Sequence, residues 1–137
     1  MSNQGPGVSN QKQTIAVKDF QFDFEKLKVY EKSLSFIDKV FQLYKQLEQE
    51  YKFSIGSNLV RAALSVANNL AEGNDKRSEK ERRRYFEISS DSTRECVSVF
   101  NVLKRQNMIQ DEIYFQLRIE AREITSMIRG LLRNDNV

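Results

Sequence analysis

Residues 111–133, DEIYFQLRIEAREITSMIRGLLR, carry the clearest pattern in this chain of 137 residues and decide its fold. Apolar and small side chains recur there at steps of three and four: Ile113, Leu117, Ala121, Ile124, Ile128 and Leu131. An α-helix turns once in about 3.6 residues, so these side chains share one face. The segment is therefore predicted to be an amphipathic helix that buries this face against other helices.

Two earlier segments are also predicted to be helices. Between about residues 24 and 51, apolar side chains again recur at steps of three and four: Leu27, Tyr30, Leu34, Ile37, Phe41 and Tyr44. A second helix, poor in bulky side chains, is predicted from about residue 57 to 72. Gly73 and Asn74 follow it, and both favour the left-handed conformation in which many helices end.

The third helix is predicted from Ser78 to about Gln106. Ser78 and Glu81 have the spacing of a capping box, in which the hydroxyl and the carboxylate satisfy each other's backbone amides. The apolar and small residues cover about half of this helix, more than packing inside one bundle needs. We therefore expect it to face a second subunit as well. The expected oligomer interface residues are Ile88, Val99 and, on the fourth helix, Ile119.

Four amphipathic helices with short connections predict an all-α fold, an antiparallel up-down-up-down four-helix bundle over residues 21–134. Composition agrees, since the chain has only five glycines and one proline. Residues 1–20 are rich in Ser, Asn and Gln and contain Gly5, Pro6 and Gly7. They are expected to form a flexible N-terminal tail.

Residue types that many enzymes need are missing. The chain has no histidine and one cysteine, Cys96, so histidine-based nucleophile systems, zinc sites and iron–sulfur clusters lack their ligands. We expect no enzymatic activity, no cofactor and no metal. Glu72 and Glu95 could lie in the interior, and we expect them to form salt bridges or caps.

The single cysteine and the lack of an apolar run long enough to cross a bilayer predict a cytoplasmic protein.

Positive charge is concentrated at two places, the start of the third helix and one side of the fourth. At roughly 100° per residue, the arginines of the fourth helix fall within about 60° of one another, beside its apolar face. Cations at a helix start oppose the helix dipole, so helix stability does not explain them. Arginine binds phosphate bidentately, and we expect binding to nucleic acid with little sequence specificity. The expected phosphate-binding residues are Arg77, Lys80, Arg82, Arg83, Arg84, Arg118, Arg122, Arg129 and Arg133.

Two other interpretations fit the same residues. Charged runs on helices often form solvated faces or salt bridges between subunits, without any ligand. Alternatively, the protein is an adaptor whose oligomer docks a partner enzyme such as a polymerase, through Ile119 and the segment that holds Phe20, Phe22 and Phe24. The net charge of +3 is too small to decide among these interpretations.

Three motifs carry a resemblance to a known family. FEKLKVYEKS at residues 24–33 is similar to F-E-x-L-x-V-W-x-K-A, and SNLVRAALSVANNLAEG at residues 57–73 is similar to S-x-L-R-R-A-A-x-S-I-P-x-N-I-A-E-G. RSEKE at residues 77–81, followed by Tyr85-Phe86 and by Ser92-x-x-Glu95, is similar to R-x-S-x-K-E-x-x-x-F…S-x-x-E. These patterns belong to the small four-helix-bundle proteins encoded in intervening sequences of bacterial 23S ribosomal RNA genes, which this chain resembles over roughly residues 24–133.

The resemblance implies a homopentamer, a ring-like barrel of bundles, that binds structured RNA such as 23S rRNA. It also implies a relationship to accessory proteins of diversity-generating retroelements, which act beside a reverse transcriptase. Tyr30 replaces the tryptophan of the pattern, and two departures matter more: Ala67 replaces proline, and Val60 replaces a residue that is often basic. Loss of the proline should straighten the second helix, and loss of the charge should slightly weaken binding.

Overall fold

The structure is a computed structural model that describes the backbone of residues 20–135 and side chains through Arg133. Four long helices make up most of it: α2 (Lys28–Gln46), α4 (Ser57–Asn74), α5 (Glu79–Arg105) and α6 (Asp111–Asp135). The shorter elements are a 3-10 turn η1 (Asp23–Lys26), α3 (Gln49–Tyr51) and a π-helical turn η2 (Lys52–Gly56). The described residues contain no strand, so the all-α prediction is confirmed. The predicted tail, apart from Phe20, lies outside the described residues.

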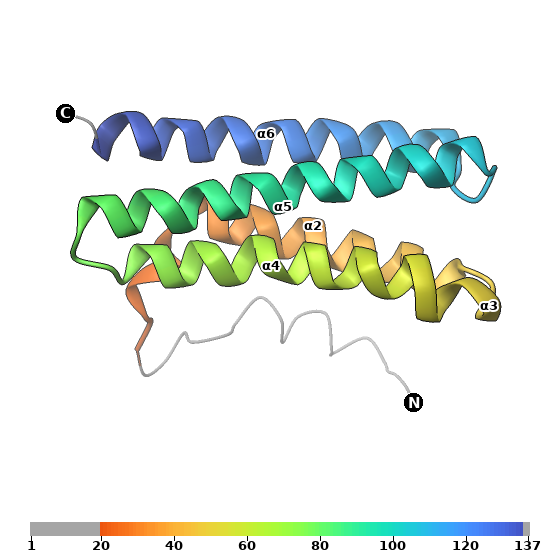
Figure 1. Ribbon diagram of the computed structural model, residues 1–137, viewed down its shortest axis with the longest axis horizontal. Helices are drawn as coiled ribbons and strands as arrows, with labels where there is room; N and C mark the ends of the chain where they lie inside the picture. Colours follow the sequence, from red (N-terminus) through yellow and green to blue (C-terminus); the bar gives the residue numbers. More distant parts are fainter. Residues whose placement is uncertain (1–19, 136–137) are drawn as a thin grey trace.

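The long helices alternate in direction, up-down-up-down, as predicted (Figure 1). Around the bundle, α2 packs against α4, α4 against α5, α5 against α6, and α6 against α2. The connection between α4 and α5 spans residues 75–78, and the one between α5 and α6 spans residues 106–110. Connections this short force consecutive helices to lie side by side.

The apolar faces meet in one continuous core. Leu117, Ala121, Ile124 and Ile128 of α6 are all buried, which confirms the seam predicted from their spacing. Across the bundle, the buried rings of Phe36 on α2 and Phe100 on α5 meet edge to face, with centroids 6.1 Å apart. Aromatic pairs in this geometry contribute roughly 1 kcal/mol beyond the area they bury.

The first helix is shorter than predicted, because the chain turns at Leu47 and Glu48. Both residues have extended backbone, with ψ of 146° and 150°. From Gln49 the chain continues through α3 and η2 directly into α4, so the gap left between the first two predicted helices, residues 52–56, is a helical turn. Leu47 is buried although it lies outside a helix. Apolar spacing therefore continues through the turn and does not mark the helix end.

The left-handed end predicted for the second helix is wrong. α4 continues through Gly73 and Asn74, and neither residue has a positive φ. Gly73 is buried, and a Cβ atom there would lie 2.9 Å from the Phe86 ring and 2.9 Å from the Cβ of Tyr85. This glycine is therefore needed for the close approach of α4 and α5, and not for an unusual backbone conformation.

Both ends of α5 are capped. At its start, the backbone amide of Glu81 donates to Oγ of Ser78 at 3.3 Å, which is the serine half of the predicted capping box. After its end, Asn107 has a φ of 57°. The amides of Asn107 and Met108 donate to the carbonyls of Lys104 and Leu103 at 3.1 and 2.8 Å, the two bonds of a Schellman motif.

Val99, one of the three residues expected at an oligomer interface, is too buried to contact another subunit. It is 6% exposed and belongs to the core of its own bundle. The wide apolar face of α5 is used inside the molecule, because α5 packs against both α4 and α6. Ile88 is half-buried, whereas Ile119 is 60% exposed and can contact another molecule.

Candidate nucleic-acid interface

A groove runs between α5 and α6 on the outside of the bundle, and we call it the arginine groove. One part encloses about 400 Å³. The residues that line this part are Thr93, Arg94, Val97, Ser98, Asn101, Arg118, Ala121, Arg122 and Thr125. Three are arginines and none is acidic, so this part of the groove attracts anions.

Arg118 is held in place by its neighbours. Its Nη1 donates to Oδ1 of Asn101 on α5 at 2.8 Å, and the hydroxyl of Tyr114 donates to the same oxygen at 2.8 Å. The guanidinium also lies over the Tyr114 ring, 5.3 Å from its centroid. A guanidinium has five N–H donors, so Arg118 keeps donors for a ligand while losing little side-chain freedom on binding.

The groove continues toward the C-terminal end of α6, where a second part encloses about 320 Å³. Its lining shares Arg94 and Thr125 with the first part and adds Arg129. Two acids, Glu87 and Asp91, also line it. Arg94 forms an ion pair with Asp91, so its charge is partly neutralised in both parts, and Arg118 and Arg122 carry most of the positive charge of the first part.

Arg122 and Arg129 differ from Arg118 and Arg94, whose side chains contact neighbouring residues. Both are exposed, and within residues 20–133 the side chain of neither forms a hydrogen bond or an ion pair. Together with Arg118 they lie on the groove side of α6, as their spacing predicted. The structure thus brings together three of the four arginines predicted on α6, whereas exposed Arg133 does not line the groove.

The basic cluster at the start of α5 divides into two groups. Nη1 of Arg83 donates to the backbone carbonyl of Leu132 at 3.1 Å, near the end of α6. A cation at a helix C-terminus is favourable, so Arg83 has a structural role. Arg82 is half-buried and also has a partner. The exposed members are Arg77, Lys80 and Arg84, and none of the three lines the groove.

Arg94 and Asn101 are two groove residues that sequence reasoning missed. Both lie on α5 and face α6, so their part in the groove depends on the packing of two helices. The only sequence signal was the positive charge of Arg94 on the third predicted helix. The nearby Asp91 and Glu95 are acidic, so the segment as a whole does not read as basic.

Glu72 and Glu95 behave as expected and form salt bridges. Glu72 pairs with Lys76 at 3.4 Å, and Glu95 pairs with Arg61 at 2.6 Å. The carboxylate in the interior is instead Glu120, which is 7% exposed. Among the described residues, no group of histidine, cysteine and acidic side chains could hold a metal ion.

Cys96 is buried in the core. Burial raises the pKa of its thiol to about 12. Thiolate, and not thiol, is the nucleophile, so this cysteine is unreactive in the folded protein.

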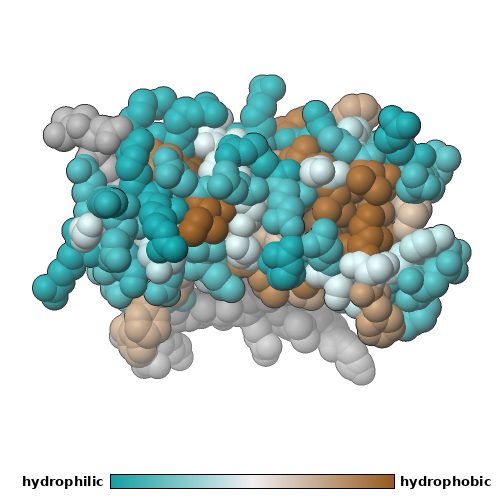
Figure 2. Space-filling view, viewed as in Figure 1, coloured by the Kyte–Doolittle hydropathy of each residue, from teal (hydrophilic) through white to brown (hydrophobic). Residues whose placement is uncertain are grey.

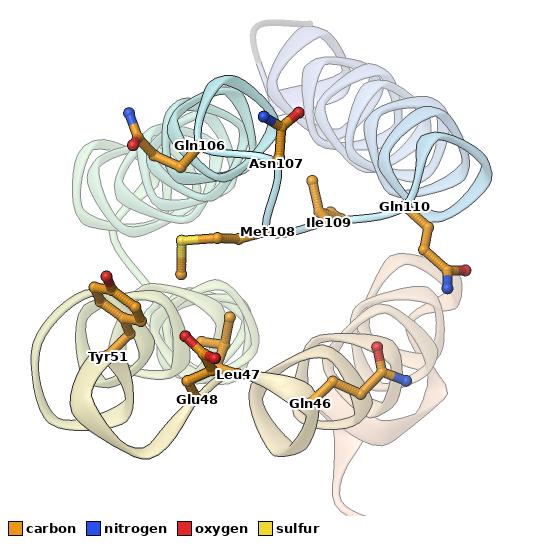
Figure 3. Close-up of a pocket in the computed structure, with 9 residues that line it drawn as sticks. All are labelled: Gln46, Leu47, Glu48, Tyr51, Gln106, Asn107, Met108, Ile109 and Gln110. Atoms are coloured by element: carbon orange, nitrogen blue, oxygen red, sulfur yellow. The ribbon is translucent and has the colours of Figure 1, made fainter.

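A pocket of about 520 Å³ lies at the end of the bundle that holds α3. Figure 3 shows the residues around it: Gln46, Leu47, Glu48, Tyr51, Gln106, Asn107, Met108, Ile109 and Gln110. The side chains of Met108 and Ile109 lie over the open end of the four helices. The lining has one acid and no cation, so this pocket is unsuited to phosphate.

None of the helices in the described part of the chain is long and apolar enough to span a membrane. The face seen in Figure 2 is mostly hydrophilic and also shows apolar areas over α4 and α5. Large exposed apolar side chains on these helices are Leu64 and Val102, which are 41% and 44% exposed.

Comparison with known proteins supports a family assignment. No curated protein matches the chain, whereas five chains of solved structures do. One is the crystal structure of a protein with unknown function from the S23 ribosomal protein family of Bacteroides thetaiotaomicron. It is 24% identical, with a TM-score of 0.72 over 77% of this chain and 95% of that one, and this similarity shows the shared fold.

A model of the 23S rRNA-intervening sequence protein family matches residues 25–130. The chain therefore belongs to the family of 23S rRNA-intervening sequence proteins.

Proposed function

We propose that this protein binds structured RNA, such as 23S rRNA, by holding its phosphates in the arginine groove. The observation that carries the proposal is the part of the groove lined by Arg94, Arg118 and Arg122 without an acidic side chain. Guanidinium groups bind phosphate through paired hydrogen bonds, and neutralising several phosphates releases counterions. The family description, which names a 23S rRNA-intervening sequence, favours RNA over other polyanions.

The exposed cations at the start of α5 can extend this surface. Arg83 donates to Leu132, so the start of α5 lies beside the end of α6. Arg77, Lys80 and Arg84 therefore lie at the same end of the bundle as Arg129 and Arg133. A strand that follows the groove toward this end would meet them after leaving Arg129. Such contacts position RNA without reading its sequence.

Binding of a labelled stem-loop of 23S rRNA, measured by fluorescence anisotropy against salt, tests the proposal. Arg118→Glu/Arg122→Glu should weaken binding at least about 10-fold at low salt. It should also lower the slope of log K against log salt by about 1.5, because two phosphate contacts are lost. Lys28→Glu/Lys45→Glu is the matched control, since both lysines are exposed on α2 and the charge change is equal. Wild-type binding that is absent at low salt or independent of salt would refute the proposal, as would equal losses in the two variants.

We further propose that the working form is a cytoplasmic, non-enzymatic homo-oligomer, and a pentamer is the form we expect. Exposed Leu64, Val102 and Ile119 could be covered by neighbouring subunits. In an oligomer several arginine grooves act together, and linked sites bind more tightly than one. Light scattering of the purified protein measures the subunit number, and a monomer at all concentrations would contradict this part.

A second candidate function is an adaptor for a partner enzyme such as a reverse transcriptase. Phe20 and Phe22 are 64% and 58% exposed, and their rings meet at 5.3 Å. Phe24 is half-buried and packs on Tyr30 at 5.0 Å. This exposed aromatic pair is the observation that favours a protein contact. Pull-down of such an enzyme by Arg118→Glu/Arg122→Glu, but not by Phe20→Ala/Phe22→Ala, would support the adaptor.

A further inference from the structure

We infer that the arginine groove accepts unpaired nucleotides, one of whose bases stacks on Phe115. The inference rests on the proposed function and specifies the kind of RNA that the groove selects. A duplex and an unpaired strand both offer phosphates, but only the unpaired strand offers open base faces.

Phe115 is 56% exposed on α6, although phenylalanine gains much from burial. Its ring lies 5.1 Å from the Tyr114 ring at an angle of 68°, so the two rings meet edge to face. In such a pair Tyr114 covers at most one face of the Phe115 ring, so the other face stays free of Tyr114. The arrangement provides a stacking surface that is already held in position.

This surface is connected to the groove through direct contacts. Tyr114 donates to Asn101, which lines the groove, and lies under the guanidinium of Arg118. Lys104 is also close to the Tyr114 ring, 6.0 Å from its centroid. Phe115 therefore contacts, through Tyr114, the part of the groove that holds Arg118.

The positions along α6 suit a strand that runs parallel to the helix. At roughly 100° and 1.5 Å per residue, Phe115 lies about 20° around the helix from Arg122 and about 10 Å along it. Arg118 lies between them, roughly 5 Å from Phe115 along the axis. A base on Phe115 would thus place the following phosphates beside Arg118 and then Arg122. Cationic grooves that end in an aromatic ring are the usual design for binding single strands.

Binding of labelled oligouridine and of a blunt RNA duplex of equal length tests the inference. Phe115→Ala should weaken binding of the single strand by about 5-fold to 100-fold and leave duplex binding unchanged, while Phe115→Tyr should retain wild-type binding. Phe53→Ala is the matched control, because Phe53 is an exposed phenylalanine, 77% exposed, that lies in η2 outside the groove. It should change neither affinity.

The outcomes separate this inference from the proposed function. If Arg118→Glu/Arg122→Glu loses RNA and Phe115→Ala binds the single strand normally, the stacking inference is wrong and phosphate binding stands. If neither variant loses RNA, both are wrong. If Phe115→Ala changes the mass measured by light scattering, Phe115 forms a protein contact, which also overturns the inference.

Discussion

Nζ of Lys39 on α2 lies 2.5 Å from Oε2 of Glu120 on α6, and this ion pair fastens the first helix of the bundle to the last. The other oxygen, Oε1, has no hydrogen-bond partner among the described residues. Lys32 and Glu123 form a second pair between the same helices at 2.5 Å. Glu120 is buried, and its ion-pair partner Lys39 has a side chain that is 35% exposed.

Removing Lys39 should therefore destabilise the fold more than an ordinary surface substitution. We expect Lys39→Met to lower the free energy of unfolding by about 1–3 kcal/mol, because the Glu120 carboxylate loses its partner. The double variant Lys39→Met/Glu120→Leu should recover most of the loss, since an apolar pair needs no compensation. Urea unfolding followed by circular dichroism measures both. Lys45→Met, at an exposed site on the same helix, should change stability by less than about 0.5 kcal/mol.

Gly73 and Gly130 should respond in opposite ways to alanine. Gly73→Ala should destabilise by about 1–3 kcal/mol, because the new methyl group meets Tyr85 and Phe86 at 2.9 Å. Gly130→Ala should stabilise by up to about 1 kcal/mol, because a Cβ there meets nothing within 4 Å and alanine favours the helix. Thermal unfolding of the two variants tests this, and equal shifts in Tm would contradict the close approach of α4 and α5.

The Cys96 thiol should resist alkylation in the native protein at pH 8 and react once urea unfolds the chain. Its pKa is about 12 when folded, against an ordinary value of 9.0. Between these values the unfolded thiol loses its proton and the folded one keeps it, so stability should fall as pH rises from about 9 to 12. Cys96→Ala should show a smaller fall. Rapid modification of the folded protein at pH 8 would contradict this burial.

Arg83 should stabilise the end of α6 and contribute little to RNA binding. Arg83→Ala removes the hydrogen bond to the Leu132 carbonyl, so amide exchange in the last turns of α6 should accelerate. We expect a stability loss of about 1 kcal/mol, since the side chain is one-third exposed. The salt slope of RNA binding should stay unchanged, whereas Arg77→Ala should lower it by up to about 1. A slope lowered equally by both variants would place Arg83 on the RNA.

Local sequence signals predicted the elements well where one residue or one spacing carries the information. Ser78 marks the start of α5, and the step of three and four residues marks α6, because caps and helix faces are local properties. The same spacing failed to mark the end of the first helix, because Leu47 is buried although it lies outside a helix. The reason is that burial, and not helicity, determines where apolar residues recur.

By itself, the sequence determined that this chain forms four helices with one apolar face each, and that arginines line one side of the last helix. The tertiary structure alone decided what those arginines face. Arg94 and Asn101 complete the groove from α5. Arg83 donates to the Leu132 carbonyl at the end of α6, and Glu120 is buried against Lys39. Helix periodicity depends on neighbours along the chain, whereas a groove depends on which two helices pack together and at what rotation.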